Sequence, residues 1–586
     1  MVRESFRGSF PLPSEPVLEN SGSTSPSDSY KHPYLSSFPG FPSFPLSAAH
    51  PFSNPAFARA PSYASRPSSR STGSLTFSSP PKSSFGSLTA GEGQEHSGSS
   101  SRNGLKKAPS QPESTAEGKK KKTPHLVAVQ ETDEKVTEYE VELLPEEHPQ
   151  QMSLWRKWLA VIIVSCCSFC VTGSSSMAAF TETPVANEFH ISHEVAVLSV
   201  SLFVEGMALG PLLTGPLSEM YGRNITYRTS FTLMFAFSFG VAFAQDTAMF
   251  LVFRFLSGLA GATFLSVAGG TVSDMFTNEE VANPMAFYTC SPFIGPVFGP
   301  LVSGFINQNL HWRWTYYILT MWIFVQTILL YILTSYSEPQ CVPETYVPVL
   351  CKWKAGRLRR STGDRNYWAP LDRRDKNVFK AIMISCYKPF ELIIFERMAL
   401  LLNLWTSFVL GILYLTFQAF PIIFMRKHGF TLQQTGLTFL GIGIGIVCAM
   451  PTQSYFNKLV ARDARLNGGS APPESRLYMG EIGAVLVPLS LFWLSFTTYA
   501  SVPWIVPIIA SIPFGTGLYY VFTAVFTYLV TAYRPLAASA MAGNTAMRCS
   551  FAAVFSLFAG YMYERLGTVG ATALLAGVMT LMAPLP

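Results

Sequence analysis

Two ionisable side chains lie inside segments of the chain that are otherwise apolar. Glu205 occurs in the run Leu-Phe-Val-Glu-Gly-Met-Ala-Leu-Gly-Pro, and Arg254 begins the run Arg-Phe-Leu-Ser-Gly. A charge at the depth of a bilayer core costs several kcal/mol unless it faces a cavity or a partner. Glu205 is therefore either a proton or cation site, or a structural acid paired with a basic residue. Arg254 is one possible partner for it.

A short charged segment, Gly-Pro-Leu-Ser-Glu-Met-Tyr-Gly-Arg at 215–223, separates two long apolar stretches. Gly215 and Gly222 allow the tight backbone that a short turn between helices needs. Glu219 and Arg223 are four residues apart, so they can meet on one helical face or reach the end of a neighbouring helix. The segment predicts a charged turn between two membrane helices.

A third feature combines glycines and prolines within one apolar segment. Gly295 and Gly299 are four residues apart and predict a smooth face on which another helix can approach closely. Pro296 and Pro300 each remove a backbone donor and bend the helix, which a membrane tolerates only where neighbours satisfy the freed groups. The pattern predicts a bent helix packed tightly on a neighbour.

Polar and aromatic residues of other apolar segments are candidates to line a cavity. They are Phe298, Tyr414, Phe417, Gln418, Tyr519, Tyr520, Asn544 and Arg548. Asn544 and Arg548 are four apart and share a helical face. Gln418 has an alternative role as a buried amide that bonds a neighbouring helix. Each aromatic residue, taken singly, is more often a packing residue than a pocket residue.

The elements that must position these residues are apolar segments of about 20 residues, long enough to cross a hydrocarbon core of about 30 Å. The chain has 586 residues, of which 48% are hydrophobic and 13% charged. Twelve such segments predict an all-α polytopic membrane protein with twelve transmembrane helices. They lie at 157–180, 194–214, 226–244, 249–270, 284–306, 315–335, 398–424, 434–452, 479–498, 503–530, 536–562 and 568–585.

Composition divides the chain into four parts. Residues 1–151 are rich in Ser, Pro and Gly and are predicted to form a disordered cytosolic N-terminal tail. Residues 152–335 form a first six-helix half, 336–397 a basic central loop, and 398–586 a second six-helix half. The Lys and Arg residues of 336–397 place that loop and both termini in the cytosol. Gly206, Gly210 and Pro211 echo Gly441, Gly445 and Pro451, which favours two pseudo-symmetric halves.

Several motifs of enzymes and metal sites are absent from the sequence. It contains no G-x-x-x-x-G-K-[ST] phosphate loop and no H-E-x-x-H zinc motif. Cys167 and Cys170 have C-x-x-C spacing, but no second pair accompanies them. We therefore expect no enzymatic activity, no catalytic residue, no cofactor and no metal.

The motifs together resemble one branch of a known family. The segment 215–223 resembles motif A of the major facilitator superfamily, with Glu219 where Asp is usual. Arg254 resembles the arginine of motif B, and 295–300 resembles motif C of the exporters. With Pro343-Glu-Thr345 and Pro473-Glu-Ser-Arg476 in addition, residues from about 150 onward resemble the fungal-type twelve-span drug:proton antiporters.

The resemblance implies export of small amphipathic or cationic compounds, such as drugs or polyamines, by proton antiport with alternating access. It implies proton coupling by Glu205 and Arg254, substrate contact by the candidate cavity residues, a latch at Gly215–Arg223, and a barrier to leak at Gly295–Pro300. Glu is common in the family at the position of Gln418, so the neutral amide weakens the case for a polycationic substrate.

The expected partners are a small-molecule substrate, protons and the lipid bilayer, with no nucleic acid, and the expected state is a monomer. The expected location is the plasma membrane, with the vacuolar membrane as a second possibility. Two alternatives stay open. One is a proton symporter or facilitator for a small nutrient or organic acid, and the other is a non-transporting membrane sensor or scaffold.

Overall fold

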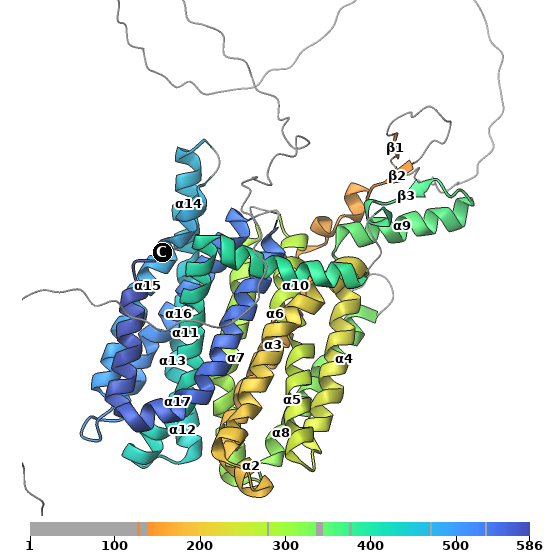
Figure 1. Ribbon diagram of the computed structural model, residues 1–586. Coiled ribbons are helices and arrows are strands. Elements are labelled where there is room, and N and C mark those ends of the chain that lie inside the picture. Colours follow the sequence, from red (N-terminus) through yellow and green to blue (C-terminus); the bar gives the residue numbers. More distant parts are fainter. Residues whose placement is uncertain are drawn as a thin grey trace, which may run out of the picture. The chain divides into compact units, whose positions relative to one another are not determined.

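The computed structural model describes residues 126–128, 139–277, 280–335, 344–373, 378–468, 471–533 and 536–585. These residues form mainly long helices that run side by side (Figure 1). Helices α9, α10 and α14 lie at one end of the helices, and α2 and α12 lie at the other (Figure 1). We call these two ends the α10 face and the α2 face.

The first half contains a helical segment for each of its predicted spans. In chain order they are α1 (Leu154–Ser176) continued by η3 (Met177–Thr181) and α2 (Glu182–Phe189), α3 (His193–Tyr221), α4 (Arg223–Ala242), α5 (Thr247–Gly261) with α6 (Thr263–Met275), α7 (Ala282–Asn309) and α8 (Arg313–Ser335). The first span is thus longer than the predicted 157–180, because the helical path continues to residue 189.

The second half is built in the same way. Its elements are α11 (Arg397–Phe420) continued by the π-helical η5 (Pro421–Lys427), α12 (Leu432–Thr438), α13 (Leu440–Ala449), η6 (Met450–Thr452), α14 (Gln453–Leu466), η7 (Pro473–Leu477), α15 (Tyr478–Phe496), α16 (Ile505–Ala532) and α17 (Ala537–Met582). Gly567 interrupts α17 with a φ of 68°, which divides it into the last two predicted spans.

Ten helical segments of the described residues are long and apolar enough to cross a membrane. The predicted count of twelve differs for two reasons. The 46-residue α17 holds two spans on either side of Gly567. Helix α4 has 20 residues, about 30 Å at 1.5 Å per residue, but Arg223, Arg228 and its hydroxyl residues lower its hydropathy. With these included, the helices agree with the predicted twelve-helix fold.

Glycines allow α3 and α5 to cross at very short range. A Cβ atom on Gly206 would collide with the carbonyl of Phe255, and one on Gly258 would collide with the carbonyl of Phe203. Small residues of this kind let two membrane helices bring their backbones together.

The second half repeats this contact where α13 crosses α16. A Cβ atom on Gly445 would collide with the carbonyl of Ile512, and one on Gly515 would collide with the carbonyl of Ile442. In both halves, each carbonyl that such a Cβ atom would meet belongs to the residue three positions before the glycine of the same helix. The two crossings are therefore structurally equivalent, as expected for two related halves.

This equivalence corrects the sequence comparison of the two halves. Gly206 corresponds to Gly445 and Gly258 corresponds to Gly515, because each pair makes the same contacts. Gly441, which the sequence sets beside Gly206, lies one turn earlier and packs against Ser511 and Ile508 of α16 instead.

The connecting segments also contain regular structure. Strands β1 (Leu126–Ala128) and β2 (Tyr139–Val141) pair antiparallel, and β2 pairs parallel with β3 (Tyr367–Trp368). The 3-10 turns η1 (Pro145–Glu147) and η2 (Pro149–Gln151) follow β2. All of these elements except β3 lie within 1–151, so the end of the predicted disordered tail is folded. The rest of that tail lies outside the described residues.

The central segment between the halves contains α9 (Val347–Thr362), η4 (Pro370–Asp372) and α10 (Val378–Phe395). Helix α10 runs across the direction of the long helices and contacts α3 of the first half and α17 of the second (Figure 1). At one contact, Pro389 of α10 packs against Gly543 of α17. The predicted central loop is thus a helical connection between the halves.

Candidate functional site

Glu205 lies where the two halves meet. It is half-buried on α3, and its Oε1 accepts a hydrogen bond from Ser550 Oγ of α17 at 3.1 Å. Because α3 and α17 belong to different halves, any separation of the halves at this level breaks the bond. Glu205 is therefore positioned where its charge state affects the contact between the halves.

Arg254 is buried in the first half, with 1% of the residue exposed. Its Nε donates to the carbonyl of Ser199 at 2.9 Å, and its Nη1 donates to the carbonyl of Ser174 at 3.2 Å. The aromatic rings of Phe203 and Tyr316 lie 4.4 and 5.8 Å from its Cζ atom. The guanidinium is thus held by carbonyl dipoles and ring faces.

The hypothesis that Glu205 and Arg254 form an ion pair is wrong for this structure. The ion pairs of the described residues do not include this pair, because Glu205 is directed to Ser550 and Arg254 to backbone carbonyls. The two residues are nevertheless on adjacent helices. Gly206, next to Glu205, packs at the same crossing as Gly258, one turn from Arg254.

The predicted turn at 215–223 is confined to Gly222, because residues 215–221 continue α3 as a helix. Of the two pairings predicted for Glu219 and Arg223, a shared helical face is wrong, and contact with the end of a neighbouring helix is confirmed for Arg223. Gly222 adopts a φ of 105° and separates α3 from α4, so Glu219 and Arg223 do not share a helical face. Arg223 Nε instead donates to Asp274 Oδ2 at the end of α6, at 3.2 Å. Its Nη1 donates to Ser218 Oγ at 3.2 Å.

Glu344, which lies in the central segment, caps the N-terminus of α4. Its two carboxylate oxygens accept the backbone N–H groups of Arg223 at 2.9 Å and Asn224 at 3.1 Å. These are donors that a helix N-terminus otherwise leaves unsatisfied. Glycine suits this position because a φ of 105° strains any residue with a Cβ atom, which would also meet the Glu344 carboxylate. We call Arg223, Asp274 and Glu344 the turn cluster.

Sequence reasoning missed two members of the turn cluster. Glu344 stood in the Pro343-Glu-Thr345 motif without an assigned role, and Asp274 was not singled out. An acid at the end of an apolar segment was the available signal for Asp274. Its partner could not be inferred, because the turn at Gly222 and the end of α6 are far apart in the sequence.

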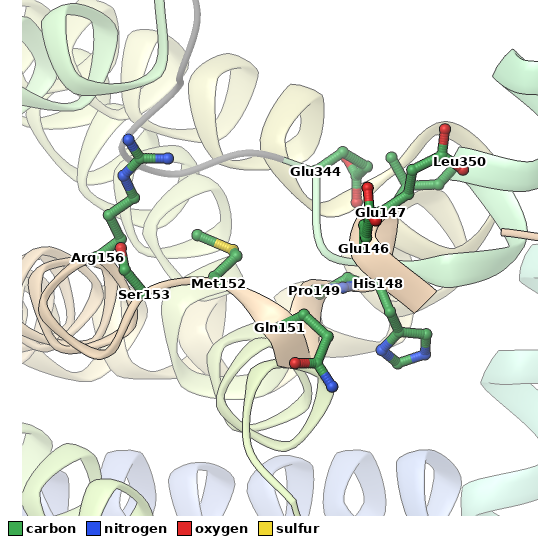
Figure 2. A pocket seen from close by; sticks show the side chains of 10 residues that line it. All are labelled: Glu146, Glu147, His148, Pro149, Gln151, Met152, Ser153, Arg156, Glu344 and Leu350. Atoms are coloured by element: carbon green, nitrogen blue, oxygen red, sulfur yellow. The ribbon is translucent and has the colours of Figure 1, made fainter. Parts of the chain in front are cut away.

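A pocket of about 470 Å³ adjoins the turn cluster (Figure 2). Polar and charged residues predominate in its lining: Glu146, Glu147, His148, Pro149, Gln151, Met152, Ser153, Arg156, Glu344 and Leu350. The residues come from the connecting segments and the start of α1, and none is a predicted substrate contact. The pocket is therefore distinct from the predicted cavity for amphipathic compounds.

The glycines of the 295–300 segment pack directly on α1. A Cβ atom on Gly295 would collide with Thr172 and Gly173, and one on Gly299 would collide with Ser176. Ser176 Oγ also donates to the carbonyl of Gly295 at 3.4 Å. The small residues of α7 therefore correspond to a close helix contact inside the first half.

On the α2 face, three predicted substrate contacts of α11 lie together at the boundary between the halves. Tyr414 Oη and Ser175 Oγ of α1 are 2.7 Å apart, and Gln418 Nε2 donates to Glu182 Oε2 of α2 at 2.5 Å. The ring of Phe417 lies 5.1 Å from that of Tyr414. Glu182 is a further residue that sequence reasoning missed, because the first span was predicted to end at residue 180.

Asn544 and Arg548 of α17 have different environments. Asn544 Nδ2 donates to Asn403 Oδ1 and Thr406 Oγ1 of α11, each at 2.9 Å, so it packs within the second half. Arg548 Cζ lies 5.1 Å from the ring of Phe526, and the Arg548 Nε is buried without a hydrogen-bond partner. Arg548 is therefore a candidate to meet a ligand, and so is the Asn544 Oδ1 atom, which is also buried without a hydrogen-bond partner.

The remaining aromatic candidates lie apart from the α11 group. Phe298 packs against Phe169 and Trp322 of its own half and is 37% exposed. Tyr520 Oη and Thr452 Oγ1, both in the second half, are 2.9 Å apart. Tyr519 is fully buried on α16. The structure thus groups Tyr414, Phe417 and Gln418 but not the whole predicted set.

A second pocket, of about 510 Å³, lies between the halves toward the α10 face. Its lining comes from the start of α1, the region joining α6 to α7, and α14: Leu154, Trp158, Phe276, Glu280, Asn283, Pro284, Ser454 and Asn457. On the α2 face, in contrast, Gln308 accepts a hydrogen bond from the backbone of Leu432 at 3.0 Å, which joins α7 to α12.

Comparison with known proteins identifies the family. The model of the Major Facilitator Superfamily matches residues 164–556, more than half of the chain. The chain belongs to this superfamily. It is a multi-pass membrane protein, and its predicted all-α fold is confirmed.

Several curated fungal proteins are similar to this member of the superfamily. "Efflux pump atB" of Aspergillus terreus is 44% identical over 386 residues, which cover 65% of this chain and 79% of the relative. "Probable drug/proton antiporter YHK8" of Saccharomyces cerevisiae is 38% identical over 444 residues, with coverages of 75% and 85%. The resemblance to the drug:proton antiporter branch is confirmed.

Solved structures of the superfamily share the fold at low sequence identity. The xylose transporter XylE of E. coli, in a partially occluded inward open conformation, matches with a TM-score of 0.53 and 16% identity, covering 73% of this chain and 96% of XylE. The human organic anion transporter MFSD10 matches with a TM-score of 0.50 and 13% identity, covering 74% and 100%.

Proposed function

We propose that this protein exports small amphipathic or cationic compounds and that an inward flow of protons drives the export. The observation that carries the proposal is the position of Glu205, an ionisable group in a membrane helix, hydrogen-bonded to Ser550 of the opposite half. The names of the fungal relatives, efflux pumps and a drug/proton antiporter, support the same function.

Orientation follows from the basic residues of the connecting segments. Helix α9 carries Lys352, Lys354, Arg357, Arg359 and Arg360, so the α10 face is proposed to be cytosolic. The α2 face is then proposed to face the external medium. The proposed location is the plasma membrane, and the proposed state is a monomer. The pocket toward the α10 face is the proposed route by which a cytosolic compound enters between the halves.

Glu205 is proposed to carry the coupling proton. As a carboxylate it accepts the Ser550 hydrogen bond, and protonation weakens that charge-assisted bond and removes the cost of a charge at membrane depth. Arg254, fixed on backbone carbonyls beside the same helix crossing, is proposed to provide a constant positive charge near this centre.

Substrate is proposed to bind between the halves against α11 and α17. Tyr414 and Phe417 offer aromatic surface, Gln418 an amide, and Arg548 a buried guanidinium with an unpaired N–H group. The few polar groups among aromatic surfaces suit amphipathic compounds. The close packing of Gly295 and Gly299 on α1 is proposed to limit leak by keeping this part of the first half rigid.

Transport into inside-out vesicles tests the proposal. With the lumen made acidic, rhodamine 6G, an azole, a polyamine and an organic acid are offered outside. Uptake of an amphipathic or cationic compound that collapses with a protonophore is the expected result. Movement of the organic acid alone, or equilibration that ignores the gradient, would contradict proton-driven export.

Glu205 is tested by Glu205→Gln beside Glu194→Gln. Glu194 is also on α3 and also contacts α17, through Tyr561, but it is exposed. We expect Glu205→Gln to lower gradient-driven uptake by about 100-fold, the scale of a lost proton-transfer group. Glu194→Gln should stay within about two-fold, as for most exposed charges. Full coupled transport by Glu205→Gln would remove Glu205 from the mechanism.

A further inference from the structure

Glu182 is a second carboxylate that joins the two halves. It begins α2, and only 5% of its side chain is exposed. Its Oε2 accepts a hydrogen bond from Gln418 Nε2 of α11 at 2.5 Å. Glu205 meets the second half through α17, whereas Glu182 meets it through α11, at the α2 face.

Among the described residues, the ion-pair partner of Glu182 is His193, which is charged only when it is protonated. Gln418 is neutral, and the described ion pairs give Glu182 no Lys or Arg partner. His193 of α3 is a titratable group whose Nε2 lies 3.9 Å from Glu182 Oε2. Tyr316 of α8 lies close by, with its hydroxyl 2.9 Å from Thr181 Oγ1. A carboxylate buried at this depth is costly to keep charged unless a charged partner is present.

His193 connects this buried carboxylate to the medium. Half of its side chain, 51%, is exposed, while its Nε2 faces Glu182. An imidazole that is exposed to water on one side can pass a proton to a carboxylate on the other. Such a path would reach Glu182 from the α2 face, opposite the pocket that lies toward the α10 face.

Closure of the α2 face controls the exposure of Glu182. The Gln418 contact and the nearby contact of Ser175 with Tyr414 both cross between the halves. When the halves separate on this face, both contacts break and the carboxylate is hydrated. When the halves close, the carboxylate returns to a dry site in which its charged form is costly.

We propose that Glu182 is a second proton-binding site, loaded from the medium on the α2 face. When that face is open, the Nε2–H bond of the His193 imidazolium breaks and the proton forms an O–H bond with a carboxylate oxygen of Glu182. The neutral imidazole that remains takes up another proton from hydronium in the medium. The neutral carboxyl keeps its carbonyl oxygen as acceptor for Gln418, so the closed contact forms without a buried charge. This inference rests on the proposed proton antiport.

The test uses the full chain in proteoliposomes with the pH varied only on the α2 side. Gradient-driven movement of rhodamine 6G is compared with rhodamine 6G exchange in the absence of a gradient. We expect Glu182→Gln to lose about 10-fold or more of the gradient-driven rate, since it cannot release a proton. Its exchange rate should stay within about two-fold of the wild type, because the amide mimics the neutral carboxyl.

Glu194→Gln serves as the matched control, because Glu194 contacts the other half on the same face but is exposed. His193→Gln should shift the pH dependence on the α2 side without abolishing transport. If Glu182→Gln does not fold, Glu182→Asp replaces it, and a shifted pH midpoint is expected. An unchanged pH profile and gradient-driven rate in the folded Glu182 variant would overturn this inference alone. A wild type without gradient-driven transport would overturn the proposed antiport as well.

Discussion

Two helix crossings, α3 with α5 and α13 with α16, have glycines at equivalent positions, and these glycines make equivalent contacts. Gly206 and Gly258 bring the backbones together in the first half, and Gly445 and Gly515 do so in the second. One residue before Gly206 stands Glu205, whereas Ile444 precedes Gly445. Four residues before Gly258 and Gly515 stand Arg254 and Ser511, respectively.

The comparison separates packing from chemistry. Both halves need the close helix contact, so both keep the glycines. Only the first half places an acid and a guanidinium beside that contact, whereas Ser511 Oγ donates to the carbonyl of Ile508 in its own helix. The crossing of the first half is therefore the proposed coupling centre, and that of the second half is its structural counterpart.

The strongest way to break this asymmetry is Arg254→Ser, which gives the first half the residue of the second. It removes the donors to the Ser199 and Ser174 carbonyls and the positive field beside Glu205. We expect gradient-driven transport to fall by about 100-fold in the vesicle assay. Arg254→Lys, which keeps the charge, should retain more activity. Near wild-type transport by Arg254→Ser would contradict a role in coupling.

The shared packing is tested by Gly258→Val and Gly515→Val. Each new side chain meets a backbone carbonyl, of Phe203 or of Ile442, that cannot move aside like a flexible side chain. We expect a comparable loss of about 1–3 kcal/mol of stability for both variants. Thermal unfolding of the detergent-solubilised protein measures it. A large effect in one half and none in the other would show that the crossings are not equivalent.

A smaller loss of stability is expected at the turn cluster, which lies at the α3–α4 turn of the first half. Glu344→Gln keeps one acceptor for the N–H groups of Arg223 and Asn224 and should cost about 1.5 kcal/mol. Asp463→Asn is the comparison in the second half, because Asp463 accepts hydrogen bonds from Ser475 and Tyr478 beside the α14–α15 connection. Thermal unfolding again provides the measurement, and an unchanged midpoint for Glu344→Gln would remove its proposed capping role.

The same carboxyl predicts a pH dependence. Burial raises the pKa of Glu344 above its usual value, although the backbone N–H groups of Arg223, Tyr346 and Asn224 favour the charged form. The folded protein then holds this proton to a higher pH than the unfolded chain. Its stabilising contribution is complete below the unfolded pKa and is lost as the pH rises through the folded pKa. Glu344→Gln should therefore flatten the decline of the unfolding temperature between the unfolded and the folded pKa of this carboxyl, and an equal slope in that pH range would contradict this.

The smallest effect is expected for Ser511→Ala. The Ser511 hydroxyl bonds only to its own helix, so its loss should change stability by about 0.5–1 kcal/mol and leave transport unchanged. Uptake and thermal unfolding of the same preparation check both statements. A transport defect comparable to that of Arg254→Ser would mean that the second crossing also takes part in coupling.

Features that depend on local composition could be predicted from the sequence. The apolar segments gave the helices, and the spacing of Gly295 and Gly299 indicated a close helix contact, because both follow from periodicity within one segment. Partners could not be predicted in this way. Arg254 is held by backbone carbonyls, which every residue has, so no side-chain pattern marks them.

Long-range pairing explains the other differences. Asp274 and Glu344 reach Arg223 from segments remote in sequence, and only the folded chain brings them together. Glu182 was excluded by the predicted end of the first span, although the helical path continues to Phe189. The sequence matched Gly206 with Gly441 instead of Gly445. These two glycines of α13 are one turn apart, and only their contacts show which of them is equivalent to Gly206.

Helix α10 has a mechanical consequence for the motion of the halves. It rests on α3 and on α17 at once, with Pro389 seated on Gly543. If α3 and α17 separate on the α10 face, α10 must lose its contact with one of these two helices. The contacts of α10 with both halves therefore limit how far, and at what energetic cost, the α10 face opens.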